Sequence, residues 1–162
     1  MITLTCIQKE GDVDMKYIIL VSHGRFAEGL KTSLEMFSGD TSKRVFALCL
    51  HNGKSADDFK TKVESFLDDH QFKDDDEFIV LSDIIGGSPL TTFLNVFSDR
   101  GLLDRSVVLG GMNFTMALTA TVSLDTMDKE AIAKKSLSEA KAALQQYQVP
   151  KASDSDDDDD DI

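Results

Sequence analysis

The chain has 162 residues, of which 41% are hydrophobic and 28% charged, the composition of a soluble globular protein with enough residues for one core. Its formal net charge is −12, and seven aspartates and one lysine within residues 151–162 account for −6 of this. Such acidity excludes nucleic acid as an expected partner, because binding a phosphate backbone needs a basic surface. No apolar run is long enough to span a bilayer, and the first residues lack the features of a secretory signal, so we expect a cytoplasmic protein.

In chain order, residues 1–15 read as an N-terminal extension, residues 16–149 as one domain, and residues 150–162 as a disordered acidic tail. Short apolar runs predict four buried strands, at 17–22, 45–50, 78–82 and 106–110. Apolar residues at helical spacing predict helices that begin near residues 25, 55 and 88 and two more near 114–124 and 129–147. In the first helix the predicted buried positions are Phe26, Leu30, Leu34 and Phe37.

Continuously apolar strands that alternate with amphipathic helices are typical of a parallel sheet covered on both faces. The sequence therefore predicts a single doubly wound α/β domain with helices on both faces of a central, mainly parallel sheet of four strands. In such folds ligands bind beyond the carboxyl ends of the strands. The residues that follow each predicted strand are accordingly the candidates for the functional site.

His23 follows the first predicted strand and precedes a helix. Alone, it would be better explained as a capping or hydrogen-bonded loop residue. Gly24 leaves the imidazole unshielded, and the helix that begins after it offers free N–H groups that favour a phosphate. Asp83, after the third strand, could either cap its own loop or accept a hydrogen bond from the His23 ring. The second role would leave the other ring nitrogen free as a nucleophile.

Gly86, Gly87 and Ser88 form the third part of the candidate site. Two glycines before Ser88-Pro89 predict a tight turn whose N–H groups point at an anion, with Ser88 as the N-cap and Pro89 as the first residue of the next helix. Oriented N–H donors suit the spread negative charge of a phosphoryl group in transfer. An ordinary tight turn is the alternative interpretation.

Other residues at strand ends are weaker candidates. His51, Met112 and Asn113 could line the edge of the cleft, whereas His70 near a helix C-terminus has a sufficient structural explanation. Cys6 and Cys49 match no metal or redox spacing, and we expect two reduced thiols with Cys49 buried in a strand. The sequence predicts no metal site and no cofactor.

Three competing motifs fail on inspection. The Gly53-Lys54-Ser55 segment ends like a nucleotide-binding P-loop, but Leu48 stands in place of its first glycine. The Gly86-Gly87-Ser88 segment begins like the nucleophile turn of a serine hydrolase, but Leu90 replaces its last glycine. No glycine-rich dinucleotide motif follows the first strand.

Three segments together resemble a known family: SHGRFAEGL (22–30), SDIIGGSP (82–89) and GGMNFTM (110–116). In this order and spacing they are similar to the EIIA domain of the mannose-type bacterial phosphotransferase system, over roughly residues 16–147. The resemblance implies that the first and third strands are neighbours, which gives the strand order 2-1-3-4. One departure is Thr115, where the family often has proline.

By this resemblance, His23 accepts phosphate from the carrier protein HPr and passes it to the EIIB component, and thereby serves the membrane components EIIC and EIID. Asp83 would be the partner of the ring, and the turn around Gly87 and Ser88 would line the phosphate pocket. The family also implies a homodimer. Two alternatives stay open: the phosphotransfer subunit of a dihydroxyacetone kinase, and a non-catalytic anion-sensing module.

Overall fold

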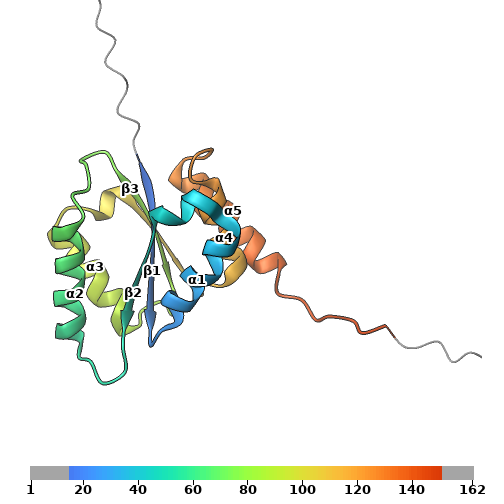
Figure 1. Ribbon diagram of the computed structural model, residues 1–162, viewed down its shortest axis with the longest axis horizontal. Helices are drawn as coiled ribbons and strands as arrows, with labels where there is room; N and C mark the ends of the chain where they lie inside the picture. The colour runs from blue at the N-terminus through green and yellow to red at the C-terminus, as the bar shows by residue number, and fades with distance from the viewer. Residues whose placement is uncertain (1–14, 151–162) are drawn as a thin grey trace, which may run out of the picture.

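Four parallel strands form the centre of the computed structural model, which describes residues 15–150 (Figure 1). The strands are β1 (Lys16–His23), β2 (Val45–Leu50), β3 (Glu77–Ser82) and β4 (Ser106–Gly110). Their order is β2-β1-β3-β4, and every neighbouring pair is parallel. This confirms the predicted fold class and order. The order reverses between β1 and β3, which is where doubly wound sheets bind their ligands.

Five α-helices cover the two faces of the sheet (Figure 1). The helices α1 (Phe26–Ser38), α4 (Phe114–Ser123) and α5 (Lys129–Ala142) lie on one face, and α2 (Ala56–Asp69) and α3 (Ser88–Asp99) lie on the other. Two short 3-10 helices, Gly39–Arg44 and Leu103–Arg105, lead into β2 and β4.

Successive residues of β1 point to opposite faces, so each face has its own core. Ile18 and Leu20 pack in the cluster beneath α1, α4 and α5, whereas Ile19 and Val21 pack in the phenylalanine-rich cluster beneath α2 and α3. All four are fully buried. A strand that is buried on both faces reads as an unbroken apolar run, which is why the sequence predicted it.

Several helix details differ from the prediction. Phe26 and Phe37 are 47% and 63% exposed, because the buried stripe of α1 runs through Ala27, Leu30 and Leu34. The helix α5 ends at Ala142 rather than near residue 147. Its buried positions are four residues apart, and the next one would be Leu144, which lies beyond the core and is 76% exposed.

The N-terminal extension was predicted at residues 1–15 and the acidic tail at residues 150–162. Apart from Met15 and Pro150, both segments lie outside the described residues. Cys6 also lies outside them. Cys49 is buried in β2, as predicted. Between residues 15 and 150, no helix is both long enough and apolar enough to cross a membrane.

Candidate functional site

The first pair of predicted site residues meets at the carboxyl ends of the two central strands. His23 is the last residue of β1, and Asp83 directly follows β3. The Asp83 Oδ2 atom accepts a hydrogen bond from the His23 backbone N–H at 2.9 Å and lies 2.9 Å from His23 Nδ1. Asp83 Oδ1 accepts the backbone N–H of Ile84 at 2.8 Å. Both oxygens of this carboxylate are therefore engaged, and its position relative to the imidazole is fixed.

This contact selects one tautomer of the His23 ring. A carboxylate only accepts hydrogen bonds, so Nδ1 carries the proton that lies toward Asp83. Nε2 is then left with its lone pair. The His23 side chain is 45% exposed whereas that of Asp83 is 14% exposed. The arrangement leaves a nucleophilic nitrogen exposed to solvent. The negative charge of Asp83, at the other ring nitrogen, stabilises positive charge on the ring.

Glycines shape the turn on which the imidazole rests. A Cβ at Gly87 would lie 2.8 Å from His23 Cε1, so only glycine leaves room for the ring there. Gly86 has a φ of +76°, which the tight turn requires. A Cβ at Gly110, the end of β4, would collide with the Ile85 side chain, so this turn also packs closely on the neighbouring strand end.

The helix α3 begins differently from the prediction. Its N-cap is Gly87 rather than Ser88, no side chain caps it, and Pro89 lies in its first turn. The backbone N–H groups of Ser88 and Leu90 therefore lie uncapped at the positive end of the helix dipole. Ser88 is exposed. Anion binding by this turn stays a prediction.

The start of α1 shows a residue that the sequence reasoning missed. Ser22 is fully buried, and its Oγ accepts the backbone N–H of Ala27 at 2.8 Å. One first-turn N–H of α1 is thus already satisfied. Gly24, with a φ of +58°, donates its N–H to Leu50 O at 2.9 Å and ties the end of β1 to the end of β2. The sequence signal for this role was a serine in an apolar strand, directly before the histidine that ends it.

His51 directly follows β2, at the same edge of the sheet as His23. Its Nε2 is 2.7 Å from Glu28 Oε1, and Arg25 Nε is 2.9 Å from Glu28 Oε2. The Arg25 guanidinium, followed by His51, holds the pKa of Glu28 below its usual range. A shallow hollow here is lined by Gly24, Arg25, Glu28, His51 and Asn52. His51 therefore lines a hollow next to Gly24, and Glu28 is a second residue that the sequence reasoning missed.

The two candidate residues after β4, Met112 and Asn113, lie in different surroundings. Met112 is 4% exposed and packs in the core beneath α1 and α4, so its side chain does not face the solvent at the strand ends. Asn113 caps α4, because its Oδ1 accepts the Met116 N–H at 2.9 Å, and it also borders a hollow beside Arg25 and Phe26. His70 ends α2 with Nδ1 at 2.9 Å from Phe66 O, a structural role as predicted.

Comparison with known proteins places the chain in a family. Residues 17–137 match the family model described as the phosphotransferase system (PTS) fructose IIA component. The chain is 25% identical to the PTS component EIIA from Streptococcus agalactiae, with a TM-score of 0.67 over 82% of this chain and 97% of that one. It is 30% identical to the PTS IIA protein associated with the fucose utilization operon of Streptococcus pneumoniae, with a TM-score of 0.63 over 82% and 98%.

A third structure, the mannose/sorbose specific IIA subunit from Enterococcus faecalis, shares the fold at 22% identity, with a TM-score of 0.66 over 85% of this chain and 98% of that one. The family match spans three quarters of the sequence and includes both strand ends that carry His23 and Asp83. The chain therefore belongs to the fructose- and mannose-type IIA family of the phosphotransferase system, a family with a phosphotransfer role.

Proposed function

We propose that this chain is the EIIA phosphoryl carrier of a bacterial sugar phosphotransferase system, acting in the cytoplasm. In this proposal His23 accepts a phosphoryl group from phospho-HPr and donates it to EIIB, which serves the membrane components EIIC and EIID. The single observation that carries the proposal is the pairing of His23 Nδ1 with Asp83 Oδ2 at 2.9 Å, on an imidazole that is 45% exposed.

The proposed reaction begins when His23 Nε2 attacks the phosphorus of phospho-HPr in line with the leaving nitrogen. The bond between phosphorus and the HPr imidazole breaks as the bond to Nε2 forms. Asp83 stabilises the positive charge that develops on the ring. The N–H groups around Gly87 and Ser88, at the start of α3, are placed to stabilise the phosphoryl oxygens. Gly24 and Gly86 keep this face open.

In the second half-reaction an EIIB histidine attacks the same phosphorus from the opposite side and His23 leaves as a neutral imidazole. No cofactor enters either step. The groups that the proposal requires are a nucleophile, a carboxylate and N–H donors, and His23, Asp83 and the α3 N-terminus supply them.

The test is incubation of the full chain with phosphoenolpyruvate, Enzyme I and HPr, followed by intact-mass spectrometry. We expect a gain of one phosphoryl group per chain that is labile in acid and stable in alkali, and its loss on addition of EIIB. The His23→Ala variant should gain none, while His70→Ala should be labelled normally. Labelling that persists in His23→Ala would overturn the assignment of the nucleophile.

The same experiment separates the alternatives. An anion-sensing module would bind phosphate without a gain in mass. A phosphotransfer subunit of a dihydroxyacetone kinase would be labelled but would transfer phosphate to a kinase subunit and not to EIIB.

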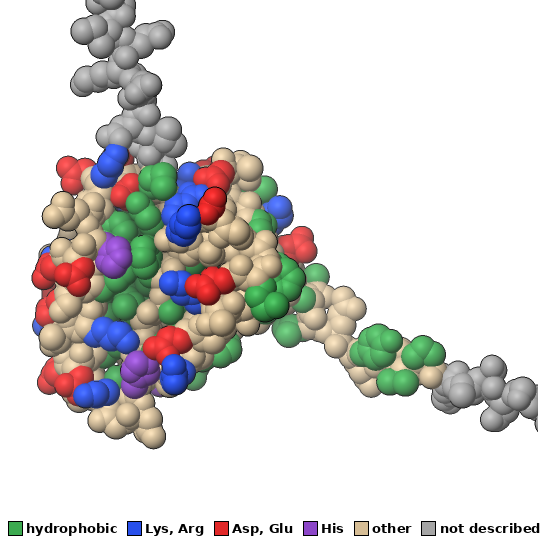
Figure 2. Space-filling model, in the orientation of Figure 1, with side chains coloured by type: hydrophobic (Ala, Val, Ile, Leu, Met, Phe, Trp, Pro, Cys, Tyr) green, Lys and Arg blue, Asp and Glu red, His purple; other side chains and the backbone are tan. Residues whose placement is uncertain are grey.

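We also propose that the chain forms a homodimer. Leu144, Tyr147 and Val149 are each at least 76% exposed on the segment that extends from α5 away from the body of the domain (Figure 2). Apolar groups at such exposure favour burial against a second chain. Sedimentation velocity should give a dimer for the wild type and a smaller species for the Leu144→Asp and Tyr147→Asp double variant. A monomeric wild type would contradict the proposal.

A further inference from the structure

Three side chains of metal-ligating type converge beside the phosphoryl site, from two elements that are distant in sequence. The ligand atoms of Glu28, Cys49 and His51 all lie within 4.8 Å of one another. We propose that these residues bind one divalent transition-metal ion of the borderline-soft type, Zn²⁺ in the first place. The inference concerns metal binding alone and does not depend on the phosphotransfer proposed for His23.

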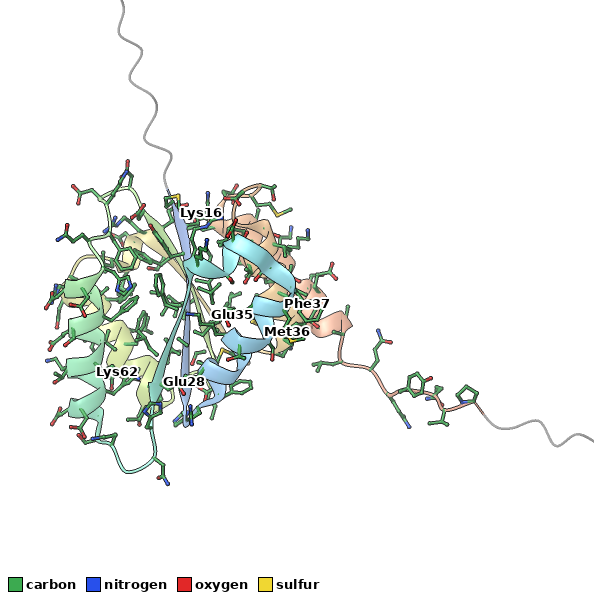
Figure 3. The ribbon with its side chains drawn as sticks, in the orientation of Figure 1. Lys16, Glu28, Glu35, Met36, Phe37 and Lys62 are labelled. Atoms are coloured by element: carbon green, nitrogen blue, oxygen red, sulfur yellow. The ribbon has the colours of Figure 1, made fainter. Side chains whose placement is uncertain are left out.

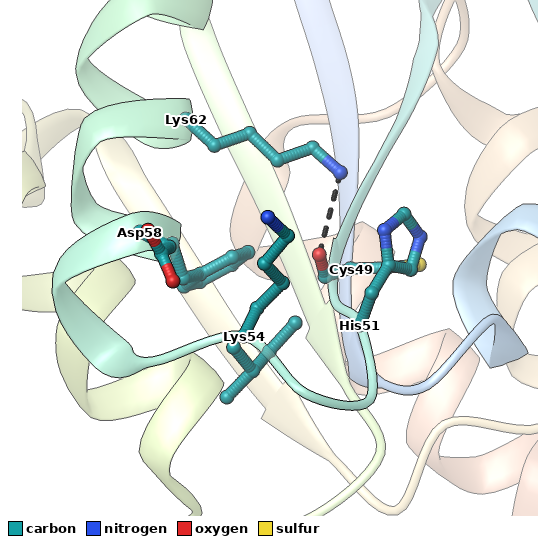
Figure 4. A pocket seen from close by; sticks show the side chains of 7 residues that line it. Cys49, His51, Lys54, Asp58 and Lys62 are labelled. Atoms are coloured by element: carbon teal, nitrogen blue, oxygen red, sulfur yellow. Dashed lines mark hydrogen bonds between the residues drawn. The ribbon is translucent and has the colours of Figure 1, made fainter.

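The fold explains how the three groups meet. Cys49 and His51 are two residues apart at the end of β2, and side chains at this spacing share one side of a strand. Figure 4 shows the His51 ring next to the Cys49 sulfur, on the side of the strand away from Lys62. Glu28 lies in the first turn of α1, close to the end of β2 (Figure 3). The sequence spacing resembles no known zinc motif because the third ligand comes from another element.

The donor set is one that zinc prefers. A thiolate, an imidazole and a carboxylate are its usual ligands, and they leave a fourth position open for water. The thiolate and the carboxylate together carry two negative charges, which balance the two positive charges of the ion. Cys49 is buried behind the site, while the Glu28 and His51 side chains are 32% and 42% exposed and border the hollow that leads to solvent.

The contact between His51 and Glu28 needs only a small adjustment, and the Cys49 sulfur lies within 4.8 Å of both. Tetrahedral zinc with bonds of about 2.0–2.1 Å separates its nitrogen and oxygen ligands by about 3.3 Å. His51 Nε2 and Glu28 Oε1 are now 2.7 Å apart, a hydrogen bond in which the imidazole donates its proton to the carboxylate. Replacing that proton by the ion would open this contact by about 0.6 Å, through rotation of two partly exposed side chains. The Arg25 side chain, 85% exposed, can leave Glu28 at little cost.

A neighbouring hydroxyl supports the sulfur ligand. Ser22 Oγ lies 3.5 Å from Cys49 Sγ and already accepts the Ala27 N–H, which leaves the Ser22 proton free to be donated to the sulfur. A hydrogen bond of this kind stabilises a thiolate and orients it, as the residues around metal ligands commonly do. Ser22 therefore joins the N-terminus of α1 to the proposed ligand on β2.

The test measures binding of the metal alone to the full chain. Zn²⁺ is titrated against a chromophoric chelator, and Co²⁺ is added in place of zinc while the absorption spectrum is recorded. We expect one ion per chain, release of about one proton from the thiol, and a thiolate-to-cobalt charge-transfer band. The acidic tail offers only oxygen ligands and cannot give this band.

Matched variants locate the site. Cys49→Ser, His51→Gln and Glu28→Gln should each weaken zinc binding at least about tenfold, and Cys49→Ser should also abolish the cobalt band. Cys6→Ser and His70→Gln, which change the other thiol and a distant imidazole, should bind as the wild type does. Circular dichroism checks that each variant is folded. Absence of the charge-transfer band in the wild type, or an unchanged affinity in Cys49→Ser, would overturn the proposal.

Discussion

Replacement of Gly87 by alanine acts mainly on the surface on which the His23 ring rests. Gly87 has φ and ψ of −69° and 156°, values that alanine adopts without strain. The added Cβ would lie 2.8 Å from His23 Cε1 and 3.5 Å from Nε2. The backbone therefore tolerates the substitution, and the steric conflict falls on the imidazole.

The size of the effect follows from these distances. Carbon atoms in contact prefer a separation of about 3.5–4.0 Å, so the ring must retreat by about 0.7 Å or more. The ring is held by its 2.9 Å contact with Asp83, and the retreat would lengthen or tilt that contact. A misplacement of about 1 Å in a reacting group costs on the order of a hundredfold in rate. We expect phosphoryl transfer to His23 to slow by about thirtyfold to a hundredfold.

Stability should change much less. Alanine is a poorer N-cap than glycine, but it also reduces the entropy of the unfolded chain, and each effect is worth about 0.5–1 kcal/mol. The two nearly cancel, so thermal unfolding of Gly87→Ala should match that of the wild type.

The assay is a rapid-quench measurement of transfer from phospho-HPr, beside a thermal unfolding curve. Gly29→Ala is the matched control, because it adds the same methyl group within α1, where the Cβ would meet no side chain and no other element within 4 Å. It should leave the rate unchanged and stabilise the helix by about 0.5–1 kcal/mol. A folded Gly87→Ala protein that transfers phosphate at the wild-type rate would refute the packing of the ring against this glycine.

Three further predictions use the same measurements. Asp83→Asn should slow transfer at least about a hundredfold with little change in unfolding temperature, because an amide no longer enforces the His23 tautomer; unaltered kinetics would remove Asp83 from the mechanism. Asn113→Ala should lower the free energy of unfolding by about 1 kcal/mol through loss of the α4 cap, without changing the transfer rate. Glu28→Gln should be less stable than the wild type in chemical denaturation at neutral pH. Because Arg25 holds the pKa of Glu28 below its usual range, that difference should persist above the ordinary pKa of a glutamate and vanish as the pH falls through the lowered value.

The sheet could be predicted because its strands are buried on both faces. Runs such as YIILVS have no polar interruption, and helices between them leave only a parallel arrangement. The exposure of Phe26 and Phe37 could not be predicted in the same way. Phe37 lies near the end of α1, where it contacts Phe114, with ring centroids 5.3 Å apart. Helical spacing identifies the apolar stripe of a helix. It does not show how much of that stripe the neighbouring elements cover.

The candidate site was predictable where it depends on strand ends and not where it depends on side-chain direction. His23 ends β1 and Asp83 follows β3, and the contact between them follows from the strand order. Met112 also follows a strand, but its side chain turns into the core. The pairing of His51 with Glu28 joins residues from separate elements, and no local sequence pattern marks it.

The central position of β1 and β3 has a consequence for fluctuations of the native state. These two strands are hydrogen-bonded on both sides and buried on both faces, so their amides should exchange with solvent only when the whole domain opens. The edge strands β2 and β4 can open locally at a lower free energy. The imidazole and its carboxylate are thus carried by the slowest-exchanging part of the chain, and local opening at either edge leaves the spacing between His23 and Asp83 intact.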